Sequence, residues 1–180
     1  MTLQALKNQF LKGSSLLQLL FLAVAVFTFS SCEKDNTDMF FFDAEAQKVK
    51  DEAIIRQYFR DNDVDTTVVE RTASGLYFLE VTEGEGEQVE LGDTVSVHYI
   101  GRFTNNSKFD SSYDRGKLFT FVVEEEQVID GWLEGVQKMR VGGEAFLYIP
   151  SHLAYGRYGS QPSVPPNTVL VFDIEVKAKK

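Results

Sequence analysis

The sequence predicts an α+β fold, in which a twisted antiparallel sheet wraps around one short helix and a further helix precedes the sheet. Three observations predict it: short segments with period-two alternation after residue 72, one short amphipathic stretch among them, and a longer helical pattern before them. Apolar residues make up 43% of the chain and aromatic residues 13%, so a packed core is expected. A length of 180 residues allows one or two ordinary domains.

The start of the chain has the pattern of a targeting segment. Two lysines precede an apolar stretch at 16–29, which is shorter than the roughly 20 residues that span a bilayer as a helix. The string Phe29-Ser30-Ser31-Cys32 resembles the lipobox of bacterial lipoproteins, whose cysteine is lipidated after cleavage before it. We therefore expect a lipoprotein signal peptide at 1–31, lipidation at Cys32 and a polar tether at 32–42. The alternative is a secreted protein with an incidental cysteine.

A helix is expected directly after the tether. Residues 43–60 contain neither Gly nor Pro, Asp43 is the expected N-cap, and short polar side chains at 61–63 are expected to end the helix. Its apolar stripe consists of Ala46, Val49, Ala53, Ile54 and Tyr58. We expect this helix, with a linker to residue 72, to pack on the following domain; pairing with a second copy of itself is the alternative.

Short strands separated by turns follow the linker. They are expected at 76–81, 94–103, 118–123, 145–149 and 168–176. Within the second of these, Val95, Val97 and Tyr99 share one face, as in a half-buried strand. One short helix is expected at 128–139, and Gly142-Gly143 ends it. Its apolar face consists of Ile129, Trp132, Leu133, Val136 and Met139.

Specific strings occur in order between residues 74 and 177. They include Val97-His98-Tyr99-Ile100-Gly101, Lys108-Phe109-Asp110-Ser111-Ser112, the run from Val128 to Val136, Ala154-Tyr155-Gly156 and Leu170-Val171-Phe172-Asp173. Together they resemble the FKBP-type peptidyl-prolyl cis-trans isomerases. The resemblance implies an FKBP-like fold for an isomerase domain at 73–180, and an enzyme that catalyses rotation about X-Pro bonds without a cofactor.

The resemblance also implies the residues of the site. Tyr99, Asp110 and Tyr155 would be catalytic, with Arg115 paired to Asp110. Trp132 would form the floor of a pocket, and Ile129 would contact the substrate through its backbone. The full substrate-binding set would be Phe109, Phe119, Phe121, Val128, Ile129, Trp132 and Phe172.

The chemistry of the reaction agrees with such residues. The barrier to rotation about the amide is about 18–20 kcal/mol, because twisting abolishes C–N resonance. A dry aromatic cavity favours the twisted amide, and Tyr155 would donate a hydrogen bond to the carbonyl before proline. Asp110 has two candidate roles: orienting Tyr99, or presenting its carboxylate to the carbonyl carbon. The reaction requires no metal. His98 and His152 are expected to be structural or exposed, since a metal site would need further ligands at characteristic spacing.

The expected partners are proline-containing polypeptides, macrolide inhibitors and, through the lipid anchor, a membrane of the cell envelope on its periplasmic side or at the cell surface. The 27 acidic and 18 basic residues give a net charge of −9, which argues against nucleic acid. The alternative to an enzyme is a non-catalytic binding or chaperone module, which docks an envelope client through the pocket or the helix at 43–60. A macrolide receptor is a third interpretation.

Overall fold

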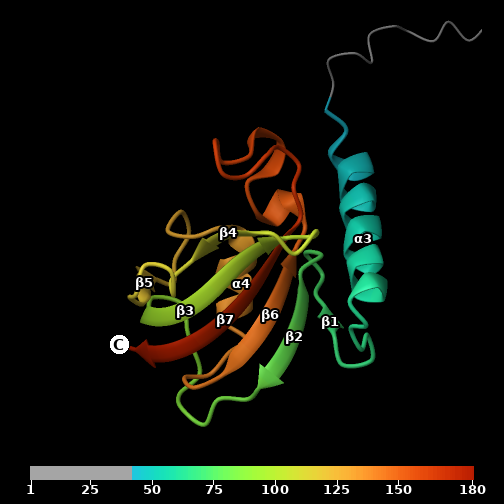
Figure 1. The fold of residues 1–180 in the computed structure, drawn as a ribbon. Helices are drawn as coiled ribbons and strands as arrows, with labels where there is room; N and C mark the ends of the chain where they lie inside the picture. The colour runs from blue at the N-terminus through green and yellow to red at the C-terminus, as the bar shows by residue number, and fades with distance from the viewer. Residues whose placement is uncertain (1–41) are drawn as a thin grey trace, which may run out of the picture. The chain divides into compact units, whose positions relative to one another are not determined.

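The centre of the molecule is a seven-stranded sheet in the order β1-β2-β6-β7-β3-β4, with β5 also paired to β3. The computed structural model describes residues 42–180, and every pairing within the sheet is antiparallel. The predicted signal peptide, Cys32 and the tether up to residue 41 lie outside the described residues. The strands are β1 (Glu70–Arg71), β2 (Tyr77–Thr82), β3 (Thr94–Phe103), β4 (Lys108–Ser111), β5 (Phe119–Val122), β6 (Glu144–Ile149) and β7 (Leu170–Lys179), as Figure 1 shows.

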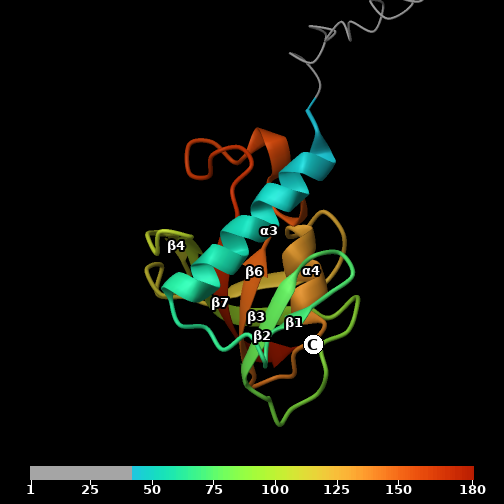
Figure 2. The same ribbon diagram turned by 90° about the vertical axis from the view of Figure 1, so that its right-hand side faces the viewer.

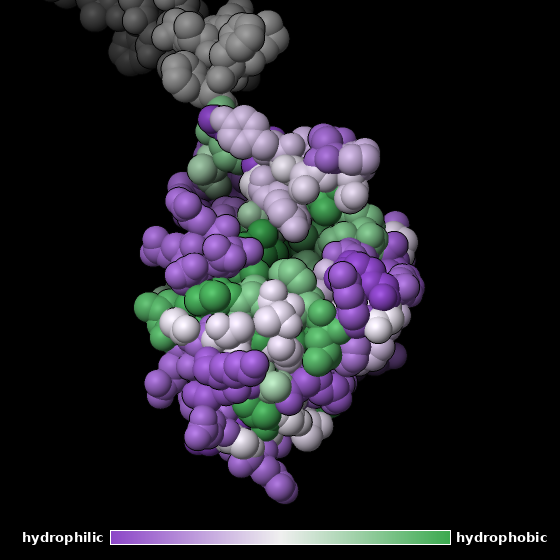
Figure 3. Space-filling model, turned by 90° about the vertical axis from the view of Figure 1, so that its left-hand side faces the viewer, coloured by the Kyte–Doolittle hydropathy of each residue, from purple (hydrophilic) through white to green (hydrophobic). Residues whose placement is uncertain are grey.

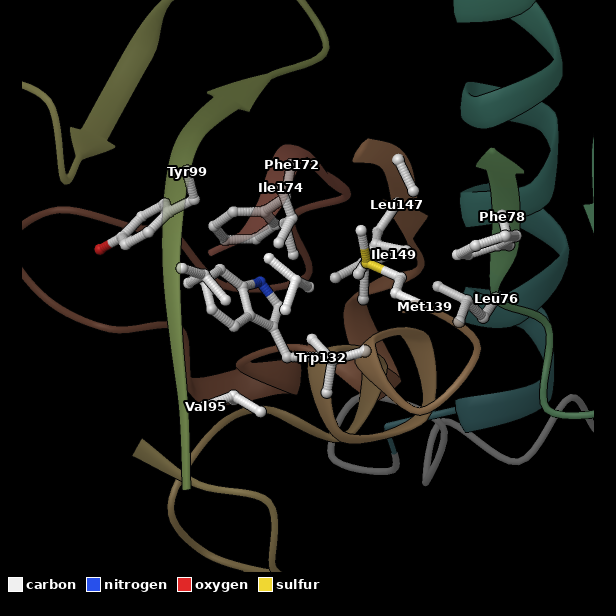
Figure 4. Close-up of a cluster of buried hydrophobic side chains, with 14 of the residues drawn as sticks. Leu76, Phe78, Val95, Tyr99, Trp132, Met139, Leu147, Ile149, Phe172 and Ile174 are labelled. Atoms are coloured by element: carbon white, nitrogen blue, oxygen red, sulfur yellow. The ribbon is translucent and has the colours of Figure 1, made fainter. Parts of the chain in front are cut away.

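The short helix α4 (Asp130–Val136) packs on one face of the sheet. A Cβ added to Gly131 would lie 2.5 Å from Ile149 Cγ2, and one added to Gly135 would lie 2.5 Å from Leu147 Cδ1. The two glycines therefore allow the helix backbone to approach β6 closely. The main core lies between helix and sheet, where Figure 4 shows Trp132 of α4 facing Tyr99 of β3 and Phe172 of β7. This arrangement confirms the predicted α+β class.

The helix α3 (Ala44–Asp61) packs on strands β2, β6 and β7 through a second cluster (Figure 2). As predicted, Asp43 is its N-cap, and the Asp43 side chain accepts a hydrogen bond of 2.9 Å from the Ala46 amide. The ring of Phe59 lies 4.7 Å from that of Tyr148, in edge-to-face geometry. The buried members of the second cluster are Ile55, Phe59, Tyr77, Tyr148, Val169 and Val171. The helix therefore packs on its own chain.

The apolar stripe predicted for this helix is not its buried face. Val49 is 72% exposed and Ile54 is 40% exposed, whereas the buried positions are Asp51, Ile55 and Phe59. The prediction counted apolar side chains, and it passed over Asp51 because an aspartate is rarely buried without partners. Here the Asp51 carboxylate has partners just after β6, at Ser151.

Candidate active site

A cavity of about 240 Å³ opens where β3, β4 and β5 meet the start of α4. Figure 3 shows a face of the molecule on which hydrophobic side chains surround a hollow. Nine of the ten predicted pocket residues line the cavity, and they come from seven separate elements and loops. The complete lining is Tyr99, Phe109, Asp110, Phe119, Gln127, Val128, Ile129, Trp132, Tyr155 and Phe172.

The floor of the cavity is Trp132, which is 3% exposed. Its ring centroid lies 4.9 Å from that of Tyr99 and 5.2 Å from that of Phe172, both in edge-to-face geometry. Such contacts hold aromatic rings at fixed angles and stabilise them beyond the area they bury. The rings converge because Tyr99 and Phe172 occupy inward positions of the neighbouring strands β3 and β7. The result is a continuous apolar surface at the bottom of the cavity.

One wall depends on a glycine. A Cβ at Gly101 would lie 2.7 Å from Phe109 Cζ and 2.8 Å from Phe172 Cε1, so any side chain there would displace one of the two rings. With glycine at this position, the rings of Phe109 and Phe172 meet edge to face at 5.6 Å. The backbone of β3 thus makes room for the wall.

Two residues differ from the prediction. Phe121 does not line the cavity; it is 5% exposed and stacks behind Phe119, with ring centroids 5.3 Å apart. Gln127 does line the cavity, directly before Val128, and was not predicted. Its neighbours Val128 and Ile129 were predicted from the family resemblance, which did not include Gln127, and its local sequence gave no signal for it.

A polar cluster lies at one edge of the cavity. The Tyr99 hydroxyl donates to Asp110, and the Arg115 guanidinium donates both to Asp110 and, at 2.7 Å, to the Tyr99 hydroxyl. The Ser111 amide donates to Asp110 Oδ1 at 2.8 Å. Burial works to raise the pKa of Asp110, but the hydrogen bonds from Tyr99 and Arg115 outweigh it and hold that pKa below its ordinary value. The pairing of Arg115 with Asp110 that was predicted is present.

Two tyrosine hydroxyls in the cavity stay protonated at neutral pH. Burial, and then the hydrogen bond to Asp110, raise the pKa of Tyr99 to about 12. Burial, and then the negative charge of Asp110, raise the pKa of Tyr155. Tyr155 is 37% exposed, so a molecule entering the cavity meets a hydroxyl that carries its proton.

The two histidines make contacts within the fold. His98 stacks on Tyr113 with ring centroids 4.3 Å apart, and its Nδ1 lies 2.9 Å from Ser112 Oγ. His152 Nε2 lies 3.0 Å from the carbonyl oxygen of Ser74. Among residues 42–180, no three His, Cys, Asp or Glu side chains are grouped so that they could hold a metal ion. In the same part of the chain, no helix has both the length and the apolar character needed to cross a membrane.

Comparison with known proteins shows which family most of the residues after α3 resemble. Residues 85–177 match the family described as FKBP-type peptidyl-prolyl cis-trans isomerase. The chain is 43% identical over 134 residues to the probable FKBP-type isomerase FkpA of Neisseria meningitidis, a match that covers 74% of this chain and 47% of that protein. It is 45% identical over 103 residues to the isomerase FKBP1A of Xenopus laevis, with 57% of this chain and 95% of that protein covered.

A solved structure extends the comparison to the fold. The crystal structure of FkpA from Escherichia coli aligns with a TM-score of 0.65 at 37% identity, and covers 76% of this chain and 62% of that one. The chain spans about half the length of its relative from Neisseria. These findings confirm the resemblance that the sequence strings indicated. The chain belongs to the FKBP-type peptidyl-prolyl cis-trans isomerase family.

Proposed function

We propose that this protein is a peptidyl-prolyl cis-trans isomerase that catalyses rotation about X-Pro bonds of proteins in the cell envelope. The observation that carries the proposal is one apolar cavity that gathers the rings of Tyr99, Trp132 and Phe172 and places Tyr155 and Asp110 at its edge. Membership of the family supports the same reaction.

The proposed mechanism is desolvation together with hydrogen bonding. A planar amide has a charge-separated resonance form that water stabilises, and a dry cavity removes that stabilisation. Since the twisted amide has less charge separation, it loses less on entering, and the barrier of about 18–20 kcal/mol falls. Each 1.4 kcal/mol removed from the barrier raises the rate about tenfold. The reaction makes and breaks no covalent bond.

The aromatic residues hold the proline. The pyrrolidine ring rests on Trp132, between the walls formed by Phe109 and Phe172. The other apolar wall residues are Phe119, Val128 and Ile129. Ile129 stands at the N-cap position of α4, where its backbone is at the cavity and contacts the substrate main chain. A compact apolar ring is the group that such a slot accommodates best.

The polar residues act on the amide. Tyr155 donates its hydroxyl hydrogen to the carbonyl oxygen of the residue before proline and holds that end while the amide turns. Of the two candidate roles for Asp110, we favour the orientation of Tyr99. The support for this choice is that the Asp110 carboxylate already accepts hydrogen bonds from Tyr99, Arg115 and Ser111.

The proposal is tested by the refolding of a protein whose slow phase is limited by proline isomerisation. The full-length protein is expected to accelerate that phase, and a macrolide ligand of the family is expected to inhibit it. The double variant Asp110→Val, Tyr155→Phe should lose most of the acceleration.

Tyr113→Phe is the matched control, since Tyr113 is 51% exposed and lies outside the cavity lining. Equal rates for wild type and the double variant contradict catalysis at this site. A protein that binds proline peptides without accelerating refolding would instead be a binding module.

We also propose that the protein is held at the envelope membrane by lipid on Cys32, exposing the isomerase domain to proline-containing clients. The string at 29–32 and the apolar stretch before it support this. Full-length protein expressed in a bacterial host should partition with the membranes, and Cys32→Ser should not. Equal partitioning of the two excludes the lipid anchor.

A further inference from the structure

A buried carboxylate joins α3 to the segment that carries Tyr155. Asp51 of α3 has an exposed fraction of 0%, and its partner Ser151 is 1% exposed. Asp51 Oδ2 accepts from the Ser151 amide at 2.8 Å and from Ser151 Oγ at 2.6 Å, while Oδ1 accepts from Gln47 Nε2 at 2.7 Å. A carboxylate is removed from water only where hydrogen bonds replace its hydration, and here three donors do so.

The bond caps a short helix that has no cap of its own. Ser151 is the first residue of η2 (Ser151–Leu153), a 3-10 turn whose N-cap position is Pro150, with no side-chain cap. The first amides of any helix lack partners inside it, and a carboxylate at that end satisfies them. The cap comes from a residue 100 positions earlier in the chain. The start of η2 is thus fixed from α3.

The capped segment leads into the cavity. Within it, the Leu153 amide donates to Pro150 O and the Ala154 amide to Ser151 O, each at 3.0 Å, and Tyr155 follows directly. The segment lies after the end of β6, so no strand pairing holds it. Tyr155 is the residue of this segment that lines the cavity. A shift at Ser151 therefore passes along one short turn to the Tyr155 hydroxyl.

We propose that Asp51 is a positioning residue for Tyr155, through which α3 sets the rate of isomerisation. This inference rests on the proposed function. Other anchors of the segment remain without Asp51: His152 contacts Ser74, Leu153 and Ala154 pack on the main core, and the Gly159 amide donates to Tyr155 O. Loss of Asp51 therefore displaces Tyr155 without releasing it. Misplacement of a reacting group by about 1 Å can reduce a rate by up to about a hundredfold, so a smaller displacement should cost about three- to tenfold.

The test measures kcat and KM of the full-length protein on a proline peptide. Asp51→Ala should lower kcat about three- to tenfold with little change in KM, because the aromatic slot that binds the ring is untouched. Asp51→Asn should restore kcat, since its amide oxygen still accepts from Ser151 and the Gln47 amide can turn to meet its NH₂ group. Ser151→Ala removes the hydroxyl bond to Asp51 and keeps the amide bond, so it should give an intermediate kcat. This variant replaces Asp51→Ala in the test if Asp51→Ala does not fold.

A double-mutant cycle separates positioning from general support of the fold. In a Tyr155→Phe background, Asp51→Ala should have no further effect on kcat, because its effect passes through the Tyr155 hydroxyl. Phe59→Leu is the control: it loosens the packing of α3 and lowers stability but leaves the bonds to Ser151, so kcat of the folded protein should stay at the wild-type value.

The outcomes are distinct. An active wild type with unchanged kcat in Asp51→Ala, additive effects with Tyr155→Phe, or an equal loss of kcat in Phe59→Leu each overturns the proposal and leaves the proposed function standing. An inactive wild type overturns the proposed function and this inference with it.

Discussion

The Tyr99 hydroxyl lies between two charged groups, since it donates to Asp110 and accepts from Arg115. A tyrosine and a carboxylate brought together at the edge of the cavity would be unfavourable without the third member, because the Asp110 charge would face the apolar lining with no opposite charge beside it. The guanidinium donates to Asp110 Oδ1 and to the Tyr99 hydroxyl oxygen. Burial works to raise the pKa of Asp110, but the hydrogen bonds from Tyr99 and Arg115 outweigh it and keep the carboxylate ionised. A fixed Tyr99 ring then holds its edge-to-face contact with the Trp132 floor.

This cluster predicts how stability depends on pH. The folded-state pKa of Asp110 is depressed, so its contribution to stability is fully present above the unfolded carboxyl pKa of about 4 and is lost as pH falls through the lower folded pKa. We expect the difference in unfolding free energy between wild type and Asp110→Asn to be constant near neutral pH and to shrink below about pH 4. Chemical denaturation of both proteins across that range measures it. The Asp110 side chain is 40% exposed, so the difference should be modest. A difference that grows on acidification contradicts the ion pair.

Sequence strings predicted individual pocket residues because the family places aromatic rings at fixed positions. They did not separate a ring that faces the cavity from one directly behind it, and Phe121 is such a ring. The two phenylalanines of β5 stack on each other and both contact Trp132, yet only Phe119 lines the cavity, and this difference is set by the three-dimensional packing. Gln127 was missed because it lines the cavity through the path of the loop before α4. A polar side chain in a loop does not reveal that position from the sequence.

At the scale of elements, α3 is joined to the FKBP-type domain along its length. Its buried side packs on aromatic rings of β2 and β6, Asp51 bonds to Ser151, and near its end the Tyr58 hydroxyl donates to Asn106 Oδ1 at 2.9 Å. Short isolated helices are marginal in water, so most of the stability of this helix comes from that packing.

Truncation of one side chain on each face of α3 tests this. Phe59→Ala should lower the free energy of unfolding by about 3 kcal/mol or more, because it empties a buried site between Tyr77 and Tyr148. Val49→Ala, on the exposed face, should change it by less than about 0.5 kcal/mol. Denaturant titration of the two variants gives both values. A small effect of Phe59→Ala on the free energy of unfolding, together with a large effect of Val49→Ala, would contradict the observed packing. It would mean that α3 buries its predicted apolar stripe against another partner.

The limits of sequence prediction at this scale have physical causes. The long strand at 94–103 was predicted with its observed bounds because its alternation is sustained, with Val95, Val97 and Tyr99 buried. The strands β1 and β4 are short and largely polar. They form because they pair with β2 and β3, and their local sequences do not predict that pairing. The buried face of α3 was also decided by its partner, since Ser151 makes burial of Asp51 favourable.

At the scale of the molecule, residues 43–180 form one compact unit, so helix and isomerase domain are expected to unfold together. The site lies on the face of the sheet that carries α4, while α3 packs on β2, β6 and β7 through the second cluster. The segment after β6 touches both: Ser151 bonds to Asp51 of α3, and Tyr155 lines the cavity.

The most direct test is the exchange between cis and trans forms of an X-Pro peptide, followed by NMR with a small amount of full-length protein. Uncatalysed exchange takes tens to hundreds of seconds at 25 °C. The account predicts that the protein brings exchange into the range of seconds or faster, leaves the cis:trans ratio of the free peptide unchanged, and loses this effect when a macrolide fills the cavity. Exchange that stays at its uncatalysed rate while peptide resonances show binding at the Trp132 cavity would contradict it.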